Sequence, residues 1–241
     1  MRPPGVVLYQ GPSVLDGEPI VMVATFDSEN GKTGNMIQTW IIRADMHPLS
    51  ALSSGADKSI CGNCRHRPAN ENSCYVVVAQ SVTAVYRAFK AGSYPPYKVT
   101  EHARFFVGRE IRLGAYGDPA AVPKDYIRQV LWLVDARTGY THQWRSKKAQ
   151  WLKGVVQASV DSEAEAQLAK SRGWRYFRVK DEADPRLPGE GSCPASSEYM
   201  GRTGKKVQCR TCTLCDGSSA SVVINGHGVR WGSRRVSLNV V

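Results

Sequence analysis

The chain has 241 residues, 42% of them hydrophobic and 22% charged, a composition that predicts a soluble globular protein with one substantial core. No apolar run approaches the roughly 18 residues of a membrane span, and the N-terminal residues turn polar too early for a secretory signal. We therefore expect a cytoplasmic protein without membrane contact. The net charge of +11 favours a polyanionic partner, DNA or RNA, and the alternative is a charge that serves only solubility.

The first part of the chain, residues 1–104, is predicted to be an irregular region of strands and long loops that packs on the core. Apolar and β-branched residues mark strands at 21–26 and 36–43, with a turn between them. Gly31-Lys32-Thr33 in that turn would fit a phosphate-binding loop only with a glycine five residues before Gly31, where Phe26 stands. This departure excludes a nucleotide-binding loop.

Seven cysteines fall into two clusters, and cysteines in a reducing compartment are metal ligands or reactive thiols more often than disulfides. In the first cluster, Cys61 and Cys64 have the spacing of adjacent metal ligands, and Cys74 follows ten residues later. His66 could supply a fourth ligand, or the three cysteines alone could hold an iron–sulfur cluster with one open iron position. The Cys-x-x-x-Cys-x-x-Cys motif typical of radical chemistry with S-adenosylmethionine is absent. Buried, unligated thiols are the alternative.

From residue 105 onward, strands and helices alternate. A capping box at Ser162-Glu-Ala-Glu165 and a glycine at 173 mark one helix clearly. Strand–helix–strand repeats predict a parallel sheet, so we expect an α/β fold in which residues 105–241 form a compact or incomplete (β/α) barrel, in one domain with the N-terminal part. The expected strands are 111–116, 140–145, 155–160, 174–179 and 220–225, and the expected helices are 82–90, 123–136, 147–153 and 162–173.

Polar residues follow successive expected strands and would converge on the carboxyl-terminal rim of a barrel, where such folds place their chemistry. They are Asp118, His142, Gln143, Ser159, Asp161, Arg178 and His227. The two carboxylates, Asp118 and Asp161, would supply a nucleophile and a general acid/base for displacement at a sugar carbon. Turn formation and helix capping are the alternatives for both.

A planar base would be held by His142, Gln143 and Trp144, because an imidazole beside an indole can combine stacking with edge hydrogen bonds. Ser159 and Arg178 are further candidates for substrate binding. Core packing is the alternative for Trp144.

The second cysteine cluster places four thiols within 23 residues, and three of them recur at intervals of three. This pattern predicts a four-thiolate zinc site with His227 as a reserve ligand, and an iron–sulfur cluster is the alternative. The four cysteines are Cys193, Cys209, Cys212 and Cys215.

The barrel-like half, the late cysteine triplet followed by a histidine and the two strand-end aspartates together resemble tRNA-guanine transglycosylases. More particularly, they resemble the phage and bacterial relatives that place 7-deazaguanines into DNA (DpdA-like proteins). The resemblance covers residues 105–230 and implies an aspartate nucleophile at the anomeric carbon, a second aspartate as acid/base and a structural zinc. The even cysteine spacing and the missing Asp-Ser-Gly-Gly-Phe segment depart from that family.

The sequence thus predicts a DNA-modifying transglycosylase that exchanges guanine for a 7-deazaguanine base, with Asp118 as nucleophile and Asp161 as acid/base. Its partners would be DNA or RNA and the free base, and a phage-encoded protein of this kind would act in the host cytoplasm. Two alternatives are a non-enzymatic zinc-knuckle protein that binds nucleic acid and an iron–sulfur enzyme that uses Cys61, Cys64 and Cys74.

Overall fold

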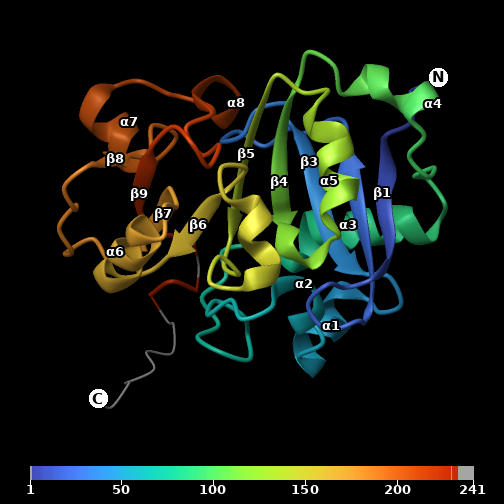
Figure 1. Cartoon of the computed structure of the whole chain (residues 1–241), viewed down its shortest axis with the longest axis horizontal. Coiled ribbons are helices and arrows are strands. Elements are labelled where there is room, and N and C mark those ends of the chain that lie inside the picture. The colour runs from blue at the N-terminus through green and yellow to red at the C-terminus, as the bar shows by residue number, and fades with distance from the viewer. Residues whose placement is uncertain (1, 229, 233–241) are drawn as a thin grey trace.

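The computed structural model describes residues 2–228 and 230–232, in which nine strands form one sheet (Figure 1). The strand order is β1-β2-β3-β4-β5-β6-β7-β9-β8, and six of the eight neighbouring pairs are parallel. The strands are β1 (Gly5–Pro12), β2 (Pro19–Thr25), β3 (Ile37–Arg43), β4 (Glu110–Tyr116), β5 (Ala136–Thr141), β6 (Gln157–Val160), β7 (Tyr176–Lys180), β8 (Glu190–Ser192) and β9 (Ser221–Asn225).

The helices are short. The α-helices are α1 (Pro48–Ser54), α2 (Lys58–Cys61), α3 (Thr83–Lys90), α4 (Val99–His102), α5 (Lys124–Leu131), α6 (Glu163–Ser171), α7 (Ser197–Thr203) and α8 (Cys209–Cys212). The 3₁₀ and π turns are η1 (Val78–Val82), η2 (Ala103–Phe105), η3 (Pro119–Ala121) and η4 (Lys147–Leu152). None of the helices in the described ranges combines the length and the apolar character needed to cross a bilayer.

The N-terminal part is more regular than the sequence indicated, because β1, β2 and β3 form an antiparallel meander. β2 is buried from Ile20 to Ala24 without alternation, as expected for a strand that is covered on both faces. β1 was not expected from the sequence, because Gly11 and Pro12 at its end weaken the strand pattern. The meander therefore extends the core of the sheet rather than decorating it.

The parallel part begins where β3 pairs with β4 and continues through β5, β6, β7 and β9, with β8 at its end. Helices α5, η4 and α6 lie between successive strands. This arrangement confirms the predicted α/β class and the predicted, mostly parallel sheet.

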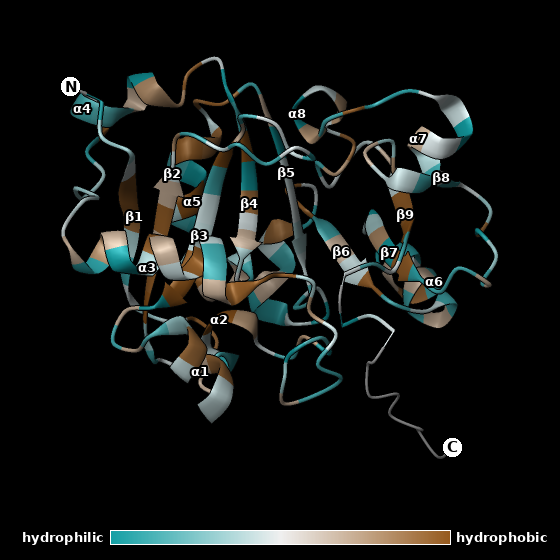
Figure 2. Cartoon of the chain, turned by 180° about the vertical axis from the view of Figure 1, so that it is seen from behind, coloured by the Kyte–Doolittle hydropathy of each residue, from teal (hydrophilic) through white to brown (hydrophobic). Residues whose placement is uncertain are grey.

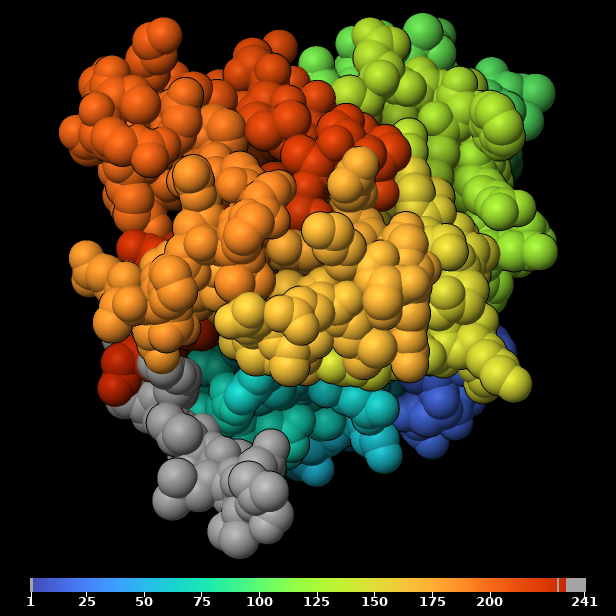
Figure 3. Space-filling view, turned by 60° about the vertical axis from the view of Figure 1, so that its left-hand side comes forward, coloured from blue at the N-terminus to red at the C-terminus, as the bar shows by residue number. Residues whose placement is uncertain are grey.

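Helices cover both faces of the sheet. Figure 1 shows α5 in front of β3 and β4, and the reverse view in Figure 2 shows α2 and α3 over the other face. Hydrophobic residues follow the strands in Figure 2, whereas hydrophilic residues dominate the peripheral loops. Residues 50–75 form a long connection that lies against the segments around β6 and α6 in the space-filling view (Figure 3).

The helix after β6 follows its sequence signals closely. Ser162 Oγ accepts the Glu165 N–H at 3.2 Å, and Gly173 has a positive φ of 74° after the helix end. The Glu165 carboxylate accepts the N–H of Asp161 at 2.8 Å, whereas a standard capping box would use the N–H of the next residue, Ser162. This helix start therefore also fixes the backbone of Asp161.

Strand β5 begins and ends earlier than predicted, at Ala136–Thr141 instead of 140–145. Helix α5 correspondingly ends at Leu131 instead of 136. The strand stops at Thr141 because the Thr141 hydroxyl and the His142 N–H both donate to the Asp118 carboxylate. His142, Gln143 and Trp144 therefore lie on a loop at the strand end.

Candidate functional site

A cavity of about 350 Å³ lies beside the parallel part of the sheet, a size at the lower end of small-molecule sites. Arg112, Gly114, Ala115 and Tyr116 of β4 line it, and Phe177 and Val179 of β7 line it at alternate positions. One face of successive parallel strands thus forms its wall. The other lining residues relevant to its chemistry are Lys32, Cys61, Cys64, His66, Ser73, Cys74, Tyr75, Asp118, Tyr140, His142, Ser159, Cys209 and His227.

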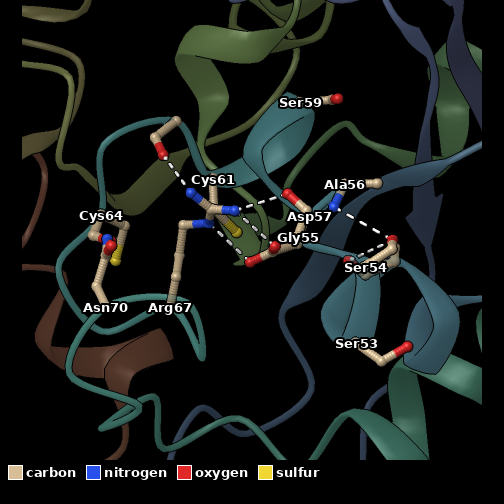
Figure 4. A network of polar contacts seen from close by, with 12 residues as sticks. Ser53, Ser54, Gly55, Ala56, Asp57, Ser59, Cys61, Cys64, Arg67 and Asn70 are labelled. Atoms are coloured by element: carbon tan, nitrogen blue, oxygen red, sulfur yellow. Dashed lines mark hydrogen bonds and ion pairs between the residues drawn. The ribbon is translucent and has the colours of Figure 1, made fainter. Parts of the chain in front are cut away.

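The first cysteine cluster belongs to this cavity, because Cys61, Cys64 and Cys74 all line it. The loop that carries them is fixed by a buried ion pair in which Arg67 donates to both carboxylate oxygens of Asp57, at 2.7 and 2.8 Å. Arg67 also donates to the Gly55 carbonyl at 2.8 Å, and Figure 4 shows it between these groups, close to the two cysteines. Charge pairing and backbone bonds together hold the thiols in place.

The three thiols are mutually close and protonated without a metal. Burial raises the pKa of Cys61, Cys64 and Cys74, and neighbouring thiols raise those of Cys61 and Cys64 further. The sulfur atoms are nevertheless not packed around one point: among the described residues, only one group of three potential ligands lies within 4.8 Å, and it contains no cysteine.

That group consists of His66, His142 and Asp161. The Nε2 atom of His66 lies 3.0 Å from Asp161 Oδ1, and its Nδ1 atom lies 2.6 Å from Ser73 Oγ. Both nitrogens of His66 are thus engaged away from the thiols, so the structure does not make it their fourth ligand. The Nε2 atom of His142 is buried without a hydrogen-bond partner among the residues that the structure describes.

Burial acts in opposite directions on the pKa values of His142, a predicted base-binding residue, and Asp161, the predicted acid/base. It lowers the pKa of His142 to about 4, so this imidazole is neutral near pH 7. Burial alone would raise the pKa of Asp161, but the hydrogen bond and the charge of His66 hold it below its ordinary value. Asp161 is therefore ionised at neutral pH although it is largely buried.

Asp118 connects three segments. Its carboxylate accepts hydrogen bonds from the Ala120 N–H, the Thr141 hydroxyl and the His142 N–H, at 2.8–2.9 Å. Its own N–H donates to the Ile60 carbonyl at 2.7 Å, next to the first thiol. Burial raises the pKa of Asp118 to about 6, in opposition to these bonds. Because the donors occupy both oxygens, the geometry favours a positioning role over the predicted nucleophilic one.

The residue before Asp118 has to be glycine. Gly117 has a φ of 79°, and a Cβ there would lie 2.7 Å from the Ile41 carbonyl oxygen. This turn lets the chain leave β4 directly into the cavity wall. The sequence prediction that Asp118 lies at a strand end is thereby confirmed.

The remaining predicted base-binding residues are mostly structural. Gln143 donates to the Cys61 carbonyl at 3.2 Å and packs on Gly62, so it supports the thiol loop. Trp144 is fully buried, and its indole donates to the Ser159 carbonyl at 3.1 Å. Core packing, the alternative for Trp144, is what the structure has. Ser159 does line the cavity.

Arg178 lies away from the cavity, on the strand position between its two lining neighbours. It donates to both oxygens of the buried Glu190, at 2.7 and 2.8 Å, and to the Pro185 carbonyl at 2.8 Å. All of its charge is matched inside the protein. The predicted substrate contact of Arg178 is thus replaced by an ion pair that joins β7 to β8.

The thiols of the second cysteine cluster come from distant positions and influence one another's pKa. Burial raises the pKa of Cys193 to about 11 and that of Cys215 far above its usual value, and Cys209 and Cys212 contribute as neighbours. Lys32 opposes this rise at Cys193 and Cys209, as Arg112 does at Cys209. Cys209 and His227 also line the cavity, so this cluster adjoins the same space as the first.

Several residues of the site had no distinct sequence signal. Arg112 donates to the Tyr75 hydroxyl at 2.7 Å, and it has no carboxylate partner within the described part of the chain. Lys32 comes from the turn between β2 and β3. Alternation along the expected strand 111–116 could have placed Arg112 on one face with Tyr116. The pairing of His66 with Asp161 spans 95 positions and could not be read from local patterns.

The chain matches no protein-family model, no curated protein and no solved structure. The cavity and its residues are therefore the basis for assigning a function.

Proposed function

We propose that the protein is an iron–sulfur enzyme whose cluster is held by Cys61, Cys64 and Cys74 and whose substrate binds in the central cavity. The observation that supports this is that these three thiols all line one cavity, which is also lined by Asp118 and His142 just after the carboxyl ends of β4 and β5. Substrate sites of parallel α/β folds lie at this position. The finer fold prediction, an incomplete (β/α) barrel, is part of the proposal and is supported by the single strand face that lines the cavity.

The spacing of the thiols fits a cluster better than one zinc ion. Sulfur ligands of a tetrahedral zinc lie about 3.8 Å apart, which follows from Zn–S bonds of about 2.3 Å. No three thiols in the described residues lie within 4.8 Å of one another. A multi-iron cluster binds its cysteines through different iron atoms and so needs wider spacing. Three cysteines leave one iron of a four-iron cluster for a ligand from the cavity.

When bound, such a cluster supplies one-electron chemistry or a Lewis-acidic iron. The chain's own residues would supply the rest. The Arg67–Asp57 ion pair orients the loop, and Tyr116 and Phe177 line the cavity with rings. Lys32 and Arg112 present positive charge to the same space, which suits an anionic substrate. With the net charge of +11, this favours DNA or RNA, or a nucleotide unit of either, as the partner.

The test is metal analysis of protein that has been purified and reconstituted without oxygen. We expect bound iron and sulfide, visible absorption and, after reduction, an electron paramagnetic resonance (EPR) signal that Cys64→Ser removes. The matched control is Cys212→Ser in the second cluster, which should leave that signal in place. Zinc without iron in the unsubstituted protein, or a signal unaffected by Cys64→Ser, would refute the proposal.

Base exchange is the second candidate, and a specific pair of carboxylates favours it. Asp118 and Asp161 both adjoin His142, and their pKa values move apart, upward for Asp118 and downward for Asp161. Pairs of this kind divide acid and nucleophile roles in glycosidic chemistry. The geometry reverses the roles expected from the sequence, because Asp161 is the ionised carboxylate and its Oδ2 accepts no hydrogen bond within the described residues.

We expect a base-exchange enzyme to incorporate labelled 7-deazaguanine into DNA and Asp161→Asn to abolish the incorporation. Asp125→Asn on the surface of α5 is the matched control and should retain full activity. Incorporation that survives Asp161→Asn, or its absence with the unsubstituted protein, would exclude this candidate. Zinc at Cys193, Cys209, Cys212 and Cys215 is a proposal compatible with either function, and its binding would require these thiols to converge more closely than they do in the structure.

A further inference from the structure

We infer that His66, His142 and Asp161 bind a divalent transition-metal ion at the edge of the cavity, at a site separate from both cysteine clusters. The three residues come from the thiol loop, the end of β5 and the end of β6. Their ligand atoms all lie within 4.8 Å of one another. Two imidazoles and one carboxylate are a common ligand set for a catalytic metal with open positions.

The distances fit a common ion. Ligand atoms bound at about 2.0–2.2 Å, with angles between octahedral and tetrahedral values, lie roughly 2.8–3.6 Å apart. His66 Nε2 and Asp161 Oδ1 are 3.0 Å apart, inside this range. Only a small inward movement of His142 is needed to complete the set. Because His66 and His142 line the cavity, the open positions of the ion would face the substrate space.

The surrounding bonds prepare these ligands. Ser73 Oγ contacts Nδ1 of His66 at 2.6 Å, which leaves Nε2 for the ion. Asp118 accepts the backbone N–H of His142, and Glu165 accepts that of Asp161, both at 2.8 Å. Outer hydrogen bonds of this sort orient metal ligands in known sites. The three partners come from three different segments, so the arrangement depends on the complete fold.

The unpartnered nitrogen of His142 favours a metal site over a simple hydrogen-bonded pair of His66 and Asp161. A hydrogen-bonded relay of Ser73, His66 and Asp161 would account for those three residues alone. It would leave His142 Nε2 buried and unsatisfied, although buried polar atoms almost always have a partner. A cation between the three residues would accept that lone pair and balance the negative charge of the carboxylate.

The inference has a consequence for the base-exchange candidate. Asp161 cannot serve as a metal ligand and as the nucleophile at a sugar carbon in the same protein. Demonstration of the metal site would therefore exclude base exchange through Asp161. It is independent of the iron–sulfur proposal, which uses other residues and a different readout.

The test is titration of the purified full chain with Mn²⁺, followed by EPR of the free and bound ion. Mn²⁺ is chosen because it prefers nitrogen and oxygen ligands, whereas the cysteines select softer metals. We expect one tightly bound ion per chain and an affinity lower by roughly tenfold or more in His142→Gln and in Asp161→Asn. His227→Gln, at another cavity-lining histidine, is the control that should retain the affinity of the unsubstituted protein.

Spin-echo measurements on the unsubstituted protein remove the dependence on variants that fold poorly. Bound Mn²⁺ should show nitrogen coupling from imidazole, as expected for two histidine ligands. No binding by the folded protein, bound ion without nitrogen coupling, or equal affinity in folded His142→Gln would each overturn the inference. A loss of affinity that is equal in the His227→Gln control would do the same.

Discussion

Asp118→Ala is expected to destabilise the folded protein by about 3 kcal/mol or more, because three buried hydrogen-bond donors lose their acceptor. Asp118 is 6% exposed, so water cannot replace the carboxylate without a rearrangement. The measurement is the midpoint of urea unfolding at unchanged slope. Asp125→Ala, on the exposed side of α5, is the control and should change the free energy of unfolding little.

The same residue distinguishes a positioning role from a chemical one. Asp118→Asn keeps one acceptor but turns an amide donor toward the Thr141 hydroxyl or the His142 N–H. We therefore expect an intermediate loss of stability and a weaker Mn²⁺ site, since the His142 backbone loses its anchor. A catalytic nucleophile would give the opposite result, which is lost activity at unchanged stability and unchanged Mn²⁺ affinity.

Arg178→Met is expected to cost about 3–5 kcal/mol, because it leaves the Glu190 carboxylate buried and without its cation. The side chains of Arg178 and Glu190 are 3% and 0% exposed, so solvent screening does not reduce the effect. The free energy of unfolding from chemical denaturation measures it. Arg178→Met combined with Glu190→Leu should recover much of the loss, because the uncompensated charge is removed together with its partner.

The matched control for this pair is Lys98→Met. Lys98 and Glu101 form an ion pair on the surface, with side chains that are 62% and 54% exposed. Removing it should leave the midpoint of unfolding almost unchanged, because water solvates both charges. Equal effects of the two substitutions would mean that Glu190 reaches water in the folded protein. The prediction also bears on function, since binding of substrate should not depend directly on a guanidinium that Glu190 already occupies.

The parallel half of the fold was predictable because its signals are local. The capping box at Ser162 and the apolar strand before Asp118 fixed one helix and one strand, and the structure has both. The sequence prediction placed the end of β5 too late for a physical reason. The carboxylate of Asp118, more than 20 positions earlier, accepts hydrogen bonds from Thr141 and His142 and ends the strand there. A tertiary hydrogen bond of this kind overrides the local preference of Tyr140–Arg145 for a strand.

The candidate site was predicted in part. Four residues selected for their positions at strand ends all line one cavity, namely Asp118, His142, Ser159 and His227. The same reasoning placed Arg178 at the cavity. Alternation along β7 instead directs this side chain to the opposite face of the strand, where it pairs with Glu190. No local pattern joins His66 to Asp161, because the two residues are 95 positions apart and meet only through the path of the long connection between β3 and β4.

The contact between the second cysteine cluster and the β2–β3 turn has a consequence for biosynthesis. Cys209 donates its N–H to the Lys32 carbonyl, and Gln208 donates to the Gly31 carbonyl across 177 positions. Contacts at such separation form late, since loop closure must precede them. On the ribosome, the β1–β3 meander and the thiols of residues 61–74 emerge long before the segment that closes the cavity. The loop of residues 61–74 is therefore accessible for an interval during synthesis, in which the proposed cluster could be inserted before the cavity closes.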